Sequence, residues 1–184
     1  MTLIVGIGGT NRPGSSSERL TEAVLGFARE QGAETRMFGG AALAALPHFA
    51  PESTDRTDGE RDLVEAVRAA DGVVIASPGY HGGVSGLVKN AIDLLEDLRG
   101  DARPYFDGRA VGLIVTAAGW QAGGVTLQAL RGITHAMRGW PTPLGVAINS
   151  VEQKPFGANG ALMDDAIAGQ LKILAEQVFS FATR

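Results

Sequence analysis

Short apolar runs alternate with amphipathic segments along the whole chain. Five runs predict strands, four of them clearly apolar and the second one weaker, at Leu3–Gly8, Glu34–Phe38, Gly72–Ala76, Ala110–Ala117 and Pro143–Ile148. Between and after them, apolar residues recur at helical spacing, which predicts helices at Ser17–Gln31, Gly59–Ala70, Ser85–Leu98, Gln121–Arg138 and Ala161–Ala182. Two stretches, Gly39–Asp58 and Asn149–Gly160, lack either pattern and are expected to be irregular.

This alternation of strand and helix predicts an α/β fold. Strands that are apolar on both faces and separated by helices form a parallel sheet covered on both sides. We expect one flavodoxin-like domain over residues 1–184, with a doubly wound five-stranded parallel sheet in the order 2-1-3-4-5. Ligands of such sheets bind at the carboxyl ends of the strands, near the switch point. The loops at that edge would be Gly9–Ser17, Ser77–Ser85 and Thr116–Gly124.

The composition narrows the classes of protein that fit this fold. A chain of 184 residues without cysteine has no disulfide, thiolate metal site or cysteine nucleophile. Its net charge of −4 argues against nucleic acid as a partner. The N-terminal apolar run is too short for a signal peptide, and no segment reaches the length of a membrane helix. We therefore expect a cytoplasmic protein with neither membrane nor nucleic acid as a partner.

The loop Gly9–Ser17 has the composition of an anion site. Gly9 and Gly14 are spaced as in a phosphate-binding P-loop, but Ser15 stands where that loop has its lysine. The glycine pattern of dinucleotide sites is also incomplete. A single phosphate still fits, because a helix N-terminus, serine hydroxyls and the Arg12 guanidinium can all donate to it. The alternative interpretation is a serine-rich turn that only caps a helix.

The other two loops combine glycines with aromatic side chains. Ser77–Ser85 carries three glycines beside Tyr80 and His81, and Thr116–Gly124 carries Trp120. Glycine exposes backbone N–H groups and lets a flat ligand come close. A solvent-facing histidine is the alternative for His81, and packing in the core or a subunit interface is the alternative for Trp120. Together with the phosphate site in Gly9–Ser17, which we call the phosphate cradle, these loops predict a site for a flat ring with polar edges and one phosphate. FMN is such a molecule.

These loops resemble those of the NAD(P)H-dependent FMN reductases. Gly9–Ser15 is similar to the family motif G-S-x-R-x-x-S, and Ser77–Asp93 is similar to S-P-E-Y-H-x-x-x-S-G-x-L-K-N-x-x-D. The third loop and its continuation Gly123–Arg131 resemble the third flavin loop of the family. Thr10 replaces the motif serine and keeps a hydroxyl. Gly79 replaces the usual glutamate, which leaves the role of that side chain unfilled and makes room for a wider pocket.

The resemblance implies FMN as the cofactor and NADPH or NADH as the electron donor, with hydride passing from the nicotinamide to flavin N5. It implies phosphate contacts from Thr10, Arg12, Ser15 and Ser17, and contacts to the isoalloxazine ring from Pro78, Gly79, Tyr80, His81, Gly82, Thr116 and Gly119. The cofactor carries this chemistry, so no catalytic acid–base residue is required. The three histidines are far apart in sequence, and no metal site is expected.

The sequence leaves the electron acceptor, a small molecule, open. In a flavin reductase the acceptor is free FMN, which is supplied to a partner monooxygenase. The alternative acceptors are quinones, azo compounds and oxidised metals. A flavodoxin-type electron carrier without NAD(P)H activity is a further alternative, although such carriers are usually far more acidic than this chain.

The helix predicted at Ser85–Leu98 suggests an oligomer. It carries apolar residues on more than one face, Leu94 among them, whereas packing on a sheet needs a single stripe. We expect the surplus at the interface of a homodimer or homotetramer, as the resemblance also suggests. His81 and Trp120 would then border a pocket completed by the neighbouring chain, and Lys89 and Asp93 would form salt bridges between subunits.

Overall fold

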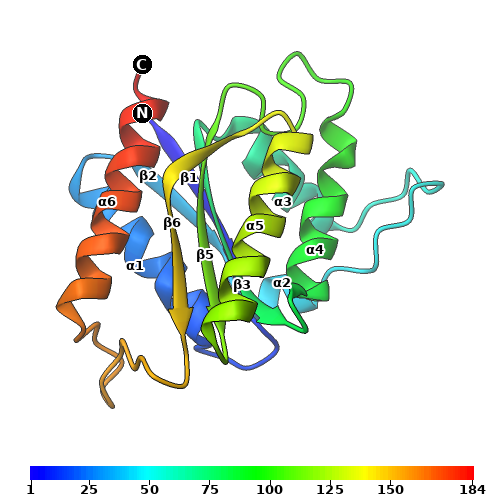
Figure 1. Ribbon diagram of the computed structural model, residues 1–184. Coiled ribbons are helices and arrows are strands. Elements are labelled where there is room, and N and C mark those ends of the chain that lie inside the picture. Colours follow the sequence, from blue (N-terminus) through cyan, green and yellow to red (C-terminus); the bar gives the residue numbers. More distant parts are fainter.

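The computed structural model describes residues 1–184 and shows a parallel β-sheet between two layers of helices (Figure 1). The strands are β1 (Leu3–Gly8), β2 (Glu34–Phe38), β3 (Gly72–Tyr80), β4 (Gly83–Val84), β5 (Ala110–Ala117) and β6 (Trp140–Asn149). Five of them lie parallel in the order β2-β1-β3-β5-β6, and the short β4 pairs antiparallel with β3. Apart from β4, this is the predicted order, and the predicted doubly wound α/β fold is confirmed.

Helices cover both faces of the sheet. They are α1 (Ser16–Glu30), α2 (Gly40–Ala44), α3 (Asp58–Ala69), α4 (Gly86–Asp93), a 3₁₀ helix η1 (Leu94–Leu98), α5 (Trp120–Ala136) and α6 (Asp165–Ala182). Helices α1 and α6 lie on one face, and α3, α4 and α5 lie on the other (Figure 1). None of these helices combines the length and the apolar character needed to cross a membrane.

The central strand β3 shows why its sequence is continuously apolar. Val73 and Ile75 pack into the core beneath α3, α4 and α5, whereas Val74 and Ala76 pack into the core beneath α1 and α6. Successive side chains of a strand point to opposite faces, so a strand covered on both sides needs apolar residues at every position.

Strand β3 continues beyond the predicted end at Ala76 and turns back into β4, where a loop was expected. The turn residues His81 and Gly82 have positive φ angles of 51° and 77°. Two consecutive positive φ angles define the tight turn that matches the twist of a hairpin. Tyr80 is therefore held at the end of a paired strand instead of in an irregular loop.

Three further boundaries differ from the prediction. The stretch expected to be irregular before α3 contains the short helix α2. Helix α6 begins later than predicted, because the Asp164 side chain caps it by accepting a hydrogen bond from the Ile167 N–H at 3.0 Å. Strand β6 begins earlier, at Trp140, whose N–H donates to the Arg109 carbonyl at 3.0 Å.

The expectation that Leu94 faces a partner subunit is wrong. After Asp93 the helix tightens into the 3₁₀ turn η1, and Leu94, Leu95 and Leu98 are all 0% exposed within the single chain. A 3₁₀ helix has three residues per turn, which changes the direction of these side chains relative to an α-helix. Lys89 and Asp93 pair within α4 at 2.6 Å, so this salt bridge forms without a second subunit.

Arg109 lies at the amino ends of the strands, where it holds several backbone carbonyls together. It is 0% exposed, and its guanidinium donates to the carbonyls of Ala70 (2.8 Å), Arg68 (2.7 Å) and Tyr105 (3.0 Å). Burial lowers the pKa of the Arg109 guanidinium to about 10, which still leaves it charged at neutral pH. No pattern in the sequence pointed to this residue.

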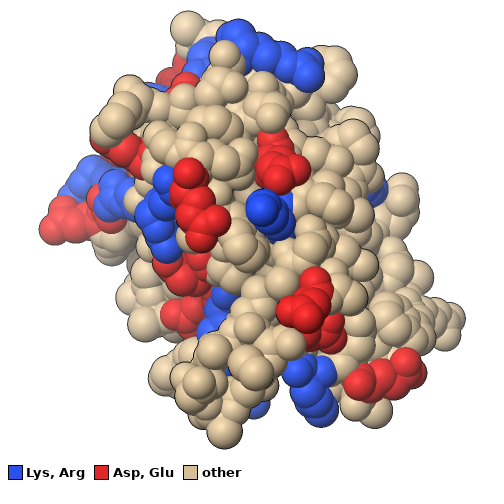
Figure 2. All heavy atoms as spheres, turned by 90° about the vertical axis from the view of Figure 1, so that its left-hand side faces the viewer, with Lys and Arg blue, Asp and Glu red and all other residues tan.

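Charges of both signs are interspersed on the side of the molecule that lies to the left in Figure 1. Figure 2 shows Lys and Arg side chains there next to Asp and Glu side chains, with no continuous patch of either sign. Within α1, Arg29 and Glu22 form an ion pair at 2.6 Å. Surface pairs of this kind contribute little to stability individually.

Candidate functional site

The loops that follow β1, β3 and β5 meet at the carboxyl edge of the sheet and enclose a cavity of about 410 Å³. It is lined by Thr10, Arg12, Ser15, Ser16, Ser17, Pro78, Gly79, Tyr80, Thr116, Ala117, Ala118 and Ser150. The structure thus brings most of the predicted site residues together. Three of them, His81, Gly82 and Gly119, do not line this cavity.

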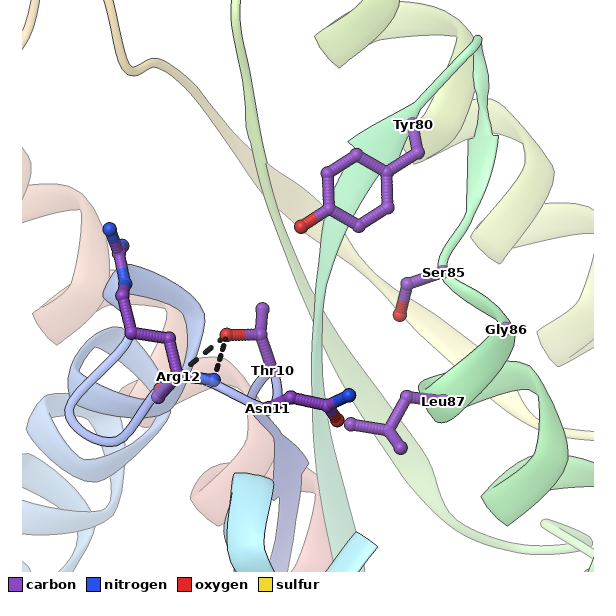
Figure 3. Close-up of a pocket in the computed structure, with 7 residues that line it drawn as sticks. All are labelled: Thr10, Asn11, Arg12, Tyr80, Ser85, Gly86 and Leu87. Carbon is purple, nitrogen blue, oxygen red and sulfur yellow. Dashed lines mark hydrogen bonds between the residues drawn. The ribbon is translucent and has the colours of Figure 1, made fainter. Parts of the chain in front are cut away.

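Two smaller cavities of about 330 Å³ each adjoin this one, and Arg12 lines all three. The first lies between the β1 loop and the start of α4 (Figure 3). Thr10 and Arg12 stand on one wall, Ser85 and Leu87 stand on the other, and the Tyr80 hydroxyl points toward the wall that carries Thr10 (Figure 3). The second extends toward the loop after β6 and includes Lys154.

The N-terminus of α1 opens into the cavity of about 410 Å³. Ser15 is the N-cap, and its buried hydroxyl accepts a hydrogen bond from the Glu18 N–H at 3.4 Å. The hydroxyls of Ser15 and Ser17 lie 3.4 Å apart. The backbone N–H groups of Ser16 and Ser17 have no acceptor within the chain. Unpaired N–H groups at a helix N-terminus, beside hydroxyls and Arg12, form a donor set that suits a phosphate.

Glycines let this loop pack on α2. A Cβ on Gly9, whose φ is 153°, would stand 2.3 Å from the Gly40 nitrogen, and a Cβ on Gly40 would stand 2.0 Å from the Thr10 carbonyl oxygen. The Thr10 hydroxyl accepts from the Arg12 N–H at 3.1 Å, which fixes the turn itself. Sequence reasoning missed Gly40, because the segment that contains it was expected to be irregular.

The two glycine-rich loops also present free backbone donors. The N–H groups of His81, Gly82, Ala118 and Gly119 have no acceptor within the chain. The His81 side chain is exposed, in agreement with the solvent-facing alternative. Backbone N–H groups at both loops would suit the polar edge of a flat ring.

Trp120 stands at the start of α5 and is 52% exposed, so packing in the core is excluded for it. Its indole N–H donates to the Glu152 carboxylate at 3.0 Å, and the Asn149 side chain donates to the same carboxylate at 2.8 Å. The hydrogen bond from Trp120 ties the start of α5 to the loop after β6, and the bond from Asn149 holds Glu152 in place.

Gly79 does not widen the cavity. A Cβ on Gly79 would stand 2.8 Å from the Thr126 hydroxyl oxygen and 3.2 Å from the Ala117 Cβ. The space that a side chain at position 79 would need is therefore filled by α5 and the end of β5.

Asn90 holds the segment before α3 in place and was missed as a positioning residue. Its Oδ1 accepts from the Phe49 N–H at 2.8 Å, and its Nδ2 donates to the Pro47 carbonyl at 2.9 Å. The signal was present in the sequence, because Asn90 belongs to the stretch Ser77–Asp93 that resembles a family motif.

Comparisons with known proteins identify the family of the chain. The family model described as NADPH-dependent FMN reductase matches residues 2–153. The FMN-dependent NADPH-azoreductase of Staphylococcus aureus is 30% identical over 122 residues, which cover 66% of this chain and 61% of that protein. The match thus spans less than two thirds of the length of this curated relative.

Two solved structures share the fold. An oxidoreductase from Corynebacterium diphtheriae superposes with a TM-score of 0.77 at 21% identity, covering 100% of this chain and 97% of the other. The flavoenzyme NAD(P)H:(acceptor) oxidoreductase from Paracoccus denitrificans superposes with a TM-score of 0.71 at 19% identity, covering 99% and 97%. At these identities the likeness concerns the fold alone.

Proposed function

Because the chain belongs to the family of NADPH-dependent FMN reductases, we propose that it binds FMN, oxidises NADPH or NADH and reduces a small-molecule acceptor. The observation that carries the proposal is one cavity at the carboxyl edge of the sheet, where serine hydroxyls, unpaired N–H groups and the Arg12 guanidinium gather at the start of α1 and the β3 and β5 ends form the remaining walls. FMN has the matching asymmetry of one phosphate and one flat ring.

The phosphate would lie at the N-terminus of α1. The free N–H groups of Ser16 and Ser17 would donate to it, together with the hydroxyls of Ser15 and Thr10. Arg12 forms no ion pair with any carboxylate of the chain, and its charge is available to the phosphate. A helix N-terminus favours an anion through both its N–H groups and its dipole.

The ring would lie between the β3 hairpin and the third loop. Pro78, Gly79 and Tyr80 form one side of the cavity and Thr116 forms the other, while the N–H groups of His81, Gly82 and Gly119 would reach the ring edge from the rim. Bound FMN would supply the redox chemistry, accepting hydride from the nicotinamide and passing electrons on. The chain would contribute orientation and hydrogen bonds, with no acid–base residue.

Two acceptors have specific support. Free FMN accords with the description of the family as FMN reductases, and its reduced form would serve a partner monooxygenase. An azo compound accords with the name of the Staphylococcus aureus relative. The open cavity in front of Tyr80 leaves room for a planar acceptor of either kind. We therefore propose free FMN as the electron acceptor, with azo compounds as the alternative.

We also propose that the protein works as a homodimer or homotetramer. Tyr80, Trp120 and Val125 are 58%, 52% and 52% exposed and all stand near the β3 hairpin or the start of α5. Large apolar side chains exposed around a binding site are typical of a surface that another chain covers.

The test is a titration of the purified protein with FMN and FAD, followed by steady-state kinetics. We expect FMN to bind more tightly than FAD, because the cradle offers one phosphate site. The loaded protein should oxidise NADPH or NADH with free FMN or an azo dye as acceptor. Tighter binding of FAD, or no oxidation of either nicotinamide by the FMN-loaded protein, would contradict the proposal.

A further inference from the structure

The cavity beside the loop after β6 is basic. Three cations, Arg12, Arg19 and Lys154, are among its lining residues, and no aspartate or glutamate lines it. The nearest acidic residue in that loop is Glu152, and its carboxylate is already engaged by Trp120 and Asn149. A cavity of about 330 Å³ whose only charged lining residues are cations suits an anion.

Its two outer cations are held in place without being neutralised. The Arg19 guanidinium lies over the Phe156 ring at 3.9 Å and donates to the Gly160 carbonyl at 3.0 Å. The Lys154 ammonium donates to the Ser150 carbonyl. Neither cation forms an ion pair, although six other arginines of the chain do. Stacking and single carbonyl bonds leave N–H groups of both side chains free for a ligand.

This basic cavity adjoins the larger cavity and extends beyond the residues assigned to the FMN phosphate. Arg12, Ser16, Thr116 and Ser150 line both cavities, whereas Arg19 and Lys154 line only the basic one. The single phosphate of FMN would be satisfied by the start of α1. Arg19 and Lys154 are therefore left over for a second anion on a molecule that also reaches the ring.

Resting on the proposed function, we propose that Arg19 and Lys154 bind the 2′-phosphate of NADPH and make the protein prefer NADPH to NADH. The two nicotinamides differ only in that phosphate. It is close to a dianion at neutral pH, and a guanidinium and an ammonium that converge on it provide charge-assisted hydrogen bonds. Contact with the Phe156 ring and the hydrogen bond to Gly160 already restrict the Arg19 side chain, so that little freedom is lost on binding.

The test compares binding of adenosine 2′,5′-bisphosphate and adenosine 5′-monophosphate to the FMN-loaded protein by calorimetry. We expect the bisphosphate to bind at least tenfold more tightly. Arg19→Ala and Lys154→Ala should each lower its affinity by about tenfold and leave the affinity for the monophosphate nearly unchanged. Lys172→Ala, an exposed residue on α6 that changes the net charge equally, is the matched control and should have no effect.

Kinetics give an independent measure. The ratio of kcat/KM for NADPH to kcat/KM for NADH should fall by about tenfold in each variant. Equal binding of the two nucleotides by the unaltered protein, or an unchanged ratio in the variants, overturns the inference. So does a loss of FMN affinity in place of nucleotide selectivity, because the two cations would then serve the cofactor.

The inference and the proposed function can fail separately. Selective binding of the bisphosphate without oxidation of NADPH contradicts the proposed function but supports the 2′-phosphate site. Oxidation of NADPH and NADH at equal efficiency supports the proposed function but contradicts the 2′-phosphate site.

Discussion

The backbone of Gly79 and the hydroxyl of Thr126 are in such close contact that a Cβ on Gly79 would stand 2.8 Å from Thr126 Oγ1. The Thr126 hydroxyl is buried and has no hydrogen-bond partner. Glycine at position 79 and threonine at position 126 therefore depend on each other. A side chain at position 79, such as the glutamate of the related motif, would have to displace the Thr126 hydroxyl.

We predict that Gly79→Ala lowers the free energy of unfolding by about 1–3 kcal/mol, the usual cost of overpacking a core. Adding Thr126→Ala should recover most of the loss, because it removes the atom that the new Cβ meets. Chemical denaturation of both single variants and the double variant measures the coupling. The matched control is Gly169→Ala on α6, where a Cβ meets nothing within 4 Å. Losses that simply add in the double variant would contradict the proposed contact.

Replacement of Arg12 tests the phosphate end of the cavity. The Arg12 side chain is exposed, so Arg12→Ala should weaken FMN binding by about tenfold, at the low end for a charge-assisted contact. The rate at saturating FMN and saturating NADPH should fall much less, because Arg12 lies at the phosphate end. Flavin fluorescence during titration gives the dissociation constant, with Lys172→Ala as the control. An unchanged dissociation constant would mean that the phosphate lies elsewhere.

The sequence predicted the sheet because its physical cause is local. Val73, Val74 and Ile75 are apolar at consecutive positions, and a strand covered on both faces needs that pattern. The phosphate site in Gly9–Ser17 could also be predicted, because Ser15 and Ser17 stand where a helix begins. The buried state of Leu94 was not, because the change from an α-helix to a 3₁₀ turn depends on tertiary packing.

The contacts that fix the site were harder to predict than the site itself. Gly79 and Thr126 are distant in sequence, and their contact exists only once α5 lies against β3. The role of Arg12 follows from its own loop, but the basic cavity needs Arg19 from α1 and Lys154 from the loop after β6. Such pairs become visible only when the chain is folded.

Arg109 gives a prediction about stability away from the site. Arg109→Lys keeps the charge but loses the planar fork that reaches the Ala70 and Arg68 carbonyls. We expect a loss of about 2–4 kcal/mol in the free energy of unfolding, because buried carbonyls lose their donors. FMN affinity of the folded variant should not change, since Arg109 lies at the opposite end of the sheet. A fall in affinity without a fall in stability would contradict this assignment.

The exposed apolar residues beside the cavity test the proposed oligomer. Val125 is 52% exposed, and a Cβ on Gly82 would stand 3.7 Å from it, so it lies against the β3 hairpin. If a second copy covers Val125, Val125→Glu places a charge in an apolar interface and should shift the protein to monomers in light scattering. Exposed Val151 in the loop after β6 provides the control Val151→Glu, which should keep the assembly intact. FMN occupancy and NADPH oxidation should fall with the loss of assembly, because Tyr80 and Trp120 would lose their covering chain. A monomeric unaltered protein, or a monomeric variant with full FMN occupancy and activity, would contradict a pocket shared between subunits.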